Sequence, residues 1–202
     1  MKLWQICVLI LFSLAIPLVA IAQKSNKTEI AIERLKNPPL GLPPLKPDQY
    51  QELTPAIIKL GRKLFFEKAL SRDGSISCAT CHKPKEAFTE NGFITSPGFK
   101  EQKNRRNTPS LLNVMYFARL HHDGRETSLE TQFILPLTAH DEMASPSPGF
   151  AVTKLGWMPE YQKLFKDAFN APPSLHTLGR HSRPIKKHCF QETRVLIVGT
   201  MA

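Results

Sequence analysis

One motif constrains this 202-residue chain more than any other feature: Cys78-Ala79-Thr80-Cys81-His82. Two residues between the cysteines place both thiols on the same turn of a helix. From there the thiols can add to the two vinyl groups of a haem, and the following His82 projects toward the iron as an axial ligand. The motif therefore predicts one covalent haem c, held by Cys78 and Cys81, with His82 as the ligand of the haem iron.

Three other interpretations of these cysteines compete with haem attachment. A thioredoxin-like dithiol normally follows a β-strand, and no alternation of period two precedes Cys78. A zinc site needs two more ligands, and the chain has neither a second closely spaced cysteine pair nor an H-x-x-x-H sequence. The third is a chance match. Because the motif stands behind an export signal, haem attachment is favoured over all three.

That export signal occupies residues 1–22. Lys2 is the only charged residue among them, residues 3–21 are mostly apolar, and Ala20-Ile21-Ala22 offers a small-x-small cleavage site. An apolar run of this length could also remain as a membrane anchor. Pro17 interrupts the run and favours cleavage instead. We therefore predict a periplasmic protein with no stable membrane span after signal cleavage.

The composition excludes some classes of protein. Hydrophobic residues make up 42% of the chain, which is too many for a disordered protein. The net charge of +10 is spread along the chain rather than clustered, so no nucleic-acid partner is predicted. Five prolines within residues 37–47 favour extended backbone. We therefore expect residues 23–53 to form a Pro-rich N-terminal arm.

The patterning after the arm is helical, with apolar residues recurring at helical spacing and long polar loops between. The predicted helices begin at Pro55, at Pro109, after Ser128 with a limit at Pro136, and at Pro159, the last ending at Phe169. No segment alternates with period two. The expected fold class is all-α, a cytochrome c-like haem domain with long loops over residues 54–180.

Four segments carry a family resemblance: residues 60–82, 105–117, 123–132 and 159–169. Together they resemble the bacterial di-haem cytochrome c peroxidases, a family that includes the methylamine-utilisation di-haem enzyme. The resemblance runs from about residue 38 to about residue 180. It covers only the N-terminal, peroxide-binding domain of a two-haem architecture. It implies reduction of hydrogen peroxide with electrons from a small c-type cytochrome or a cupredoxin.

The resemblance also implies roles for single residues. Cys78, Cys81 and His82 match the haem-attaching thiols and the axial ligand. Gln132 matches the distal-pocket glutamine, Glu142 the distal acid–base glutamate, and Asn107 a calcium-ligating asparagine. Without the family, Gln132 equally suits a core amide bonded to backbone, and Glu142 suits a solvated acidic turn. The resemblance supports a calcium site less well, because the family's other calcium ligands come largely from the second domain.

Two departures from the family pattern bear on the mechanism. His122 stands where many members have a tryptophan between the haems, which removes the usual electron relay. Residues 83–120 contain no histidine, and Phe99 lies near the place where many members carry a distal one. The pattern therefore predicts an open distal side that needs no reductive activation.

The chain has no second C-x-x-C-H sequence, so two readings compete with a complete peroxidase. A mono-haem electron carrier would use a methionine as second axial ligand, with Met115, Met143 and Met158 available. A non-functional fragment of a damaged gene is the other. We expect residues 181–202 to be a frameshifted tail, because the amphipathic pattern stops at Arg180. His181, His188 and Cys189 would then have no role.

Overall fold

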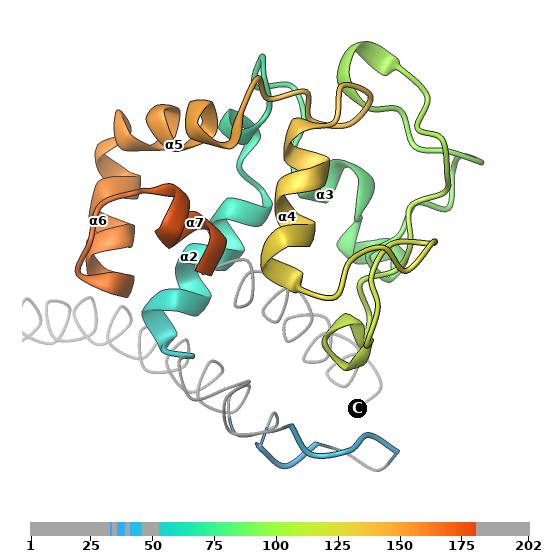
Figure 1. The fold of residues 1–202 in the computed structure, drawn as a ribbon, viewed down its shortest axis with the longest axis horizontal. Coiled ribbons are helices and arrows are strands. Elements are labelled where there is room, and N and C mark those ends of the chain that lie inside the picture. Colours follow the sequence, from blue (N-terminus) through green and yellow to red (C-terminus); the bar gives the residue numbers. More distant parts are fainter. Residues whose placement is uncertain (1–32, 34–35, 39–40, 46–52, 181–202) are drawn as a thin grey trace, which may run out of the picture. The chain divides into compact units, whose positions relative to one another are not determined.

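The computed structural model describes residues 33, 36–38, 41–45 and 53–180. The chain divides into two units, Met1–Pro55 and Ala56–Ala202, and nearly all described residues belong to the second. No strand occurs among the described residues, where only isolated bridges are found. The all-α prediction is therefore confirmed. The α-helices are α2 (Pro55–Phe65), α3 (Cys78–Cys81), α4 (Leu129–Thr138), α5 (Pro148–Gly156), α6 (Pro159–Phe169) and α7 (Leu175–Arg180) (Figure 1).

A single hydrophobic core joins these helices. α2 buries Leu60, Leu64 and Phe65 along one face, because residues three and four apart share a side of a helix. α6 contributes Tyr161 and Phe165 to the same core. The Tyr161 hydroxyl donates to Glu67 Oε2 at 2.7 Å, which satisfies a phenol that is fully buried. The predicted apolar faces of both helices are thus confirmed.

α4 stands between two parts of this unit (Figure 1). On one side, α5 packs against α6 and α7, and α4 itself contacts α5 and α7. On the other side lie the long loops of residues 83–128, broken only by single 3-10 turns at Pro84–Glu86, Phe99–Glu101 and Val114–Tyr116. A further 3-10 turn, Lys68–Leu70, packs against α5. The loops meet α3 at the edge of the helical core.

One predicted helix is wrong. The segment that begins at Pro109 forms only the short turn Val114–Tyr116. The Ser110 hydroxyl donates to the Ala87 carbonyl at 2.6 Å and accepts the Leu112 N–H at 3.1 Å. These bonds give the backbone an alternative to helix, and Asn113 then takes a left-handed conformation at φ 60°.

Two other helices differ from expectation. α4 continues to Thr138, two residues beyond the proline that was expected to limit it. α5 was not predicted, although its start is a strong signal: Ser147 accepts the Phe150 N–H at 3.1 Å, and Pro148 takes the first helical position.

The two ends of the chain remain predictions. The signal at residues 1–22, most of the arm at 23–53 and the tail at 181–202 lie outside the described residues. Within the described part, no helix is long and apolar enough to cross a membrane.

Candidate haem-binding site

The C-x-x-C-H motif forms its own short helix. Cys78 is the first residue of α3 and Cys81 the last, so both thiols lie on one turn. Thr80, between them, accepts the Ser77 N–H at 3.0 Å through its hydroxyl. The His82 N–H donates to the Cys78 carbonyl at 2.9 Å and ends the helix. Neither Cys78 nor Cys81 is in a disulfide, and both are partly exposed, which fits attachment of a haem by two thioether bonds.

The ring of His82 is oriented by a backbone carbonyl. Its Nδ1 lies 3.0 Å from the oxygen of Phe88. A carbonyl oxygen only accepts, so the proton must be on Nδ1 and the lone pair on Nε2. This is the tautomer in which Nε2 can bind a metal, and a partner at Nδ1 is the usual way in which a ligating histidine is fixed. The residues present therefore fit an axial haem ligand.

Burial and a negative charge suppress ionisation of Cys81. Burial, followed by the negative charge of Glu142, raises the pKa of the Cys81 thiol from its ordinary value of 9.0 to about 11, although a hydrogen bond from Ser96 opposes the rise. A thiol in this state is a poor nucleophile at neutral pH. Glu142 thus contributes negative charge to the surroundings of Cys81.

This shift predicts a pH dependence. The thiol has a pKa of 9.0 in the unfolded chain and of about 11 in the folded chain, so the folded state holds the proton more tightly. The folded state is therefore most stable below pH 9, and it loses this part of its stability as the pH rises from 9 toward 11. We expect alkaline denaturation of the haem-free chain in this window, measured by circular dichroism against pH. The haem-loaded chain, whose thioether cannot titrate, is the control. An identical alkaline transition in both forms would contradict the assignment to Cys81.

Glu142 lies on the turn that follows α4. Its own N–H donates to the Ala139 carbonyl at 3.1 Å, and its carbonyl accepts the Phe99 N–H at 2.8 Å. Gly98 touches the same turn so closely that a Cβ there would overlap the Asp141 carbonyl. The loop of residues 96–99 thus contacts Cys81 through Ser96 and Glu142 through Phe99. Phe99, expected near the site of a distal histidine, is itself buried in the core.

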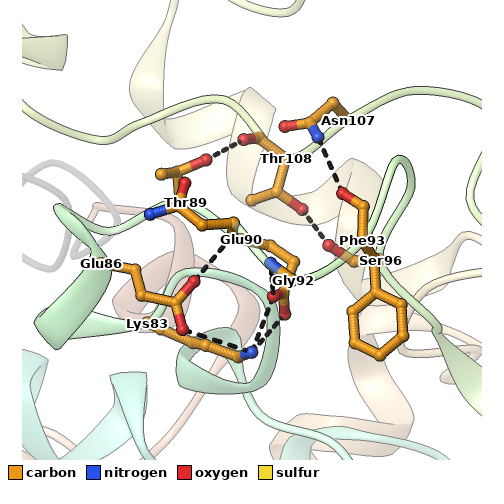
Figure 2. Close-up of polar contacts among 10 residues, drawn as sticks. Lys83, Glu86, Thr89, Glu90, Gly92, Phe93, Ser96, Asn107 and Thr108 are labelled. Atoms are coloured by element: carbon orange, nitrogen blue, oxygen red, sulfur yellow. Dashed lines mark hydrogen bonds and ion pairs between the residues drawn. The ribbon is translucent and has the colours of Figure 1, made fainter.

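Gln132 and Asn107, the other two residues that the resemblance indicates, have different surroundings. Gln132 is half-buried on α4, next to Phe133, which shares the core against which Cys78 packs. The Asn107 amide donates to the carbonyl of Phe93 at 3.2 Å (Figure 2). It also donates to the carbonyl of Ile94 at 3.0 Å. The structure therefore uses Asn107 to hold a loop. In the described part of the chain, no three His, Cys, Asp or Glu residues gather in a way that could hold a metal ion.

His122 also has a structural partner. Its Nε2 lies 2.9 Å from the Asn107 carbonyl, so the histidine that replaces the family's tryptophan ties two loops together. Ser96 was missed by sequence reasoning and carries no pattern that could reveal it. Gly98 follows Pro97, and a Pro-Gly pair does indicate a turn, but not its contact with Asp141.

Known proteins resemble this chain over the region that carries the C-x-x-C-H motif. A family model described as di-haem cytochrome c peroxidase matches residues 55–191, which continues past the residue near 180 where the resemblance was expected to end. The chain is 42% identical over 119 residues to methylamine utilization protein MauG of Methylorubrum extorquens, covering 59% of this chain and 33% of that one. It is 39% identical over 111 residues to cytochrome c551 peroxidase of Pseudomonas aeruginosa, covering 55% and 32%.

A solved structure of a MauG-like protein associated with microbial copper homeostasis is also similar. Its TM-score is 0.63 at 27% identity, covering 80% of this chain and 49% of that one. The chain spans about a third of the length of the two curated relatives. The family model matches well over half of the chain, and the motif that holds haem lies inside the match. The chain therefore belongs to the di-haem cytochrome c peroxidase family.

Proposed function

We propose that residues 54–180 form a haem c-dependent peroxidase domain that reduces hydrogen peroxide with electrons from a small c-type cytochrome or a cupredoxin. The observation that carries the proposal is the C-x-x-C-H turn with its oriented His82 ring, which lies inside the match to the di-haem peroxidase family. Peroxide cleavage also needs an acid–base group on the face of the haem opposite His82, and Glu142 is the residue that the family resemblance assigns to this task. The peroxidase relatives support the reaction class.

Each residue has a distinct task in this proposal. Cys78 and Cys81 hold the haem through thioether bonds, and His82 presents Nε2 to the iron. Haem, when bound, supplies the iron at which the peroxide O–O bond is cleaved. Glu142 takes a proton from the oxygen that approaches the iron and returns it to the oxygen that leaves as water. Gln132 positions the peroxide by hydrogen bonding.

The competing function is a mono-haem electron carrier with a methionine ligand. Met115 and Met143 are buried, and Met158 packs against the core, as methionines do when they fill space.

An optical spectrum of the ferric, haem-loaded chain separates the two functions. We expect a high-spin spectrum that changes on mixing with hydrogen peroxide, because a peroxidase keeps one side of the iron available. A low-spin spectrum typical of methionine and histidine ligands, unaltered by peroxide, would assign the chain to electron transfer instead.

The remaining parts of the proposal concern the rest of the chain. Residues 1–22 direct export to the periplasm, residues 23–53 form the Pro-rich arm, and residues 181–202 are a frameshifted tail of a truncated di-haem enzyme. Asn107 takes part in calcium binding only if further ligands join it. The coding DNA downstream of codon 180 tests the tail: a shifted frame that closes at once, or that lacks a second C-x-x-C-H, overturns it.

A further inference from the structure

The carbonyl that orients His82 belongs to an unusual turn. Ala87 and Phe88 both adopt the left-handed conformation, at φ 55° and 57°, although neither is glycine. A residue with a Cβ in this conformation is higher in free energy than one in ordinary backbone, because the Cβ crowds the neighbouring carbonyl oxygen. Two in succession persist only where the surrounding structure holds them in place. Here the strained pair points the Phe88 carbonyl at His82 Nδ1, 3.0 Å away.

The ends of this turn are joined by backbone bonds. The Lys83 N–H donates to the Thr89 carbonyl at 3.1 Å, and the Lys83 carbonyl accepts the Phe88 N–H at 2.9 Å. Since Lys83 directly follows His82, the turn starts at the residue after the ligand and folds back onto the ligand's ring. Any movement of residues 83–90 is therefore transmitted to the imidazole.

An ion pair closes the same turn (Figure 2). Lys83 Nζ lies 2.7 and 2.6 Å from the two oxygens of Glu90, whose exposed fraction is only 3%. The Gly92 N–H donates to Glu90 Oε1 at 2.9 Å. Burial alone would raise the pKa of the Glu90 carboxyl, but the bonds from Lys83 and Gly92 outweigh it and hold the pKa below its usual value. The buried Glu90 carboxylate is thus paired with Lys83, a cation that belongs to the same turn.

We propose that the Lys83–Glu90 ion pair is a positioning device for His82, which holds the strained Ala87–Phe88 turn so that the Phe88 carbonyl accepts from Nδ1. This inference rests on the haem attachment in the proposed function. Hydrogen bonding at Nδ1 raises the basicity of a ligating imidazole and strengthens its bond to the metal. Loosening the turn weakens that bond and raises the reduction potential of the iron.

The test compares haem-loaded variants by resonance Raman spectroscopy of the ferrous form and by redox titration. In Glu90→Gln and Lys83→Met we expect the iron–histidine stretching band to move to lower frequency and the reduction potential to rise. Lys83→Arg, which keeps the cation, should have the same stretching frequency and reduction potential as wild type. Lys83 is partly exposed, so Lys83→Met decides the matter if Glu90→Gln does not fold.

A matched control separates positioning from general loss of stability. Glu67 is another partly buried carboxylate, bonded to Tyr161 and to the Ala69 N–H. Glu67→Gln should lower thermal stability and leave both haem readouts unchanged. Unchanged readouts in Glu90→Gln and Lys83→Met, or an equal shift in Glu67→Gln, would overturn the positioning role alone. A wild-type chain that carries no haem would instead overturn the proposed function on which it rests.

Discussion

Replacing Glu142 with glutamine should leave the haem attached and slow the reaction with hydrogen peroxide by about two to four orders of magnitude, the usual contribution of a positioned acid–base group. Glutamine has nearly the same size and can still form hydrogen bonds, but it cannot accept a proton from peroxide at neutral pH. Stopped-flow mixing of the ferric, haem-loaded chain with peroxide measures the rate.

Asp141→Asn is the matched control for this variant. Asp141 adjoins Glu142 and is partly buried, and its carboxylate lies 3.8 Å from Arg105 Nε and 3.8 Å from His140 Nδ1, both on exposed side chains. Its replacement removes one negative charge and should change the rate by no more than a few-fold. If Glu142→Gln reacts as fast as wild type, Glu142 has no part in the mechanism. If both variants are equally slow, loss of charge rather than proton transfer is the cause.

The Gly98→Ala variant should be destabilised by about 3 kcal/mol or more, at the upper end of what overpacking costs. An added Cβ would overlap the Asp141 carbonyl, which is backbone and cannot rotate away as a side chain can. Relief requires that the 96–99 loop or the Glu142 turn move, so the reaction with peroxide should slow as well. Denaturant unfolding of the haem-loaded chain measures the change in midpoint.

Gly156→Ala provides the comparison for Gly98. Gly156 ends α5, and nothing lies within 4 Å of the position that a Cβ would occupy. Alanine there should leave the chain as stable as wild type or slightly more stable, since alanine reduces the entropy of the unfolded chain. Equal midpoints for the two variants would show that the Gly98 contact does not constrain the turn.

The helices that could be predicted from sequence are those whose signals are local. α2 and α6 each begin at a proline and carry an apolar stripe, and both form as predicted. The segment after Pro109 has the same signals but does not form a helix, because Ser110 bonds to the carbonyl of Ala87 far back in the chain. Such a contact between distant residues leaves no periodic pattern in the sequence.

The same distinction holds for the site. Cys78, Cys81 and His82 could be predicted because five consecutive residues define the motif, and the structure places them on one turn with a fixed imidazole. The surroundings of Glu142 depend on loops that meet only in the folded chain, such as the bond from the Phe99 N–H to its carbonyl; only the resemblance indicated this residue, and its role stays a prediction. The left-handed pair Ala87–Phe88 has no sequence signal at all, since neither residue favours that conformation. The roles of Gln132 and Asn107 stay predictions.

The central claim is that this chain carries haem at Cys78 and Cys81, and mass spectrometry of the peptide that contains both tests it most directly. The chain should be produced in cells that attach haem to other c-type cytochromes. We predict that the peptide carries the added mass of one haem, with both thiols consumed and His82 present in the same peptide. A peptide mass without haem, from cells that load their other cytochromes normally, would contradict the account.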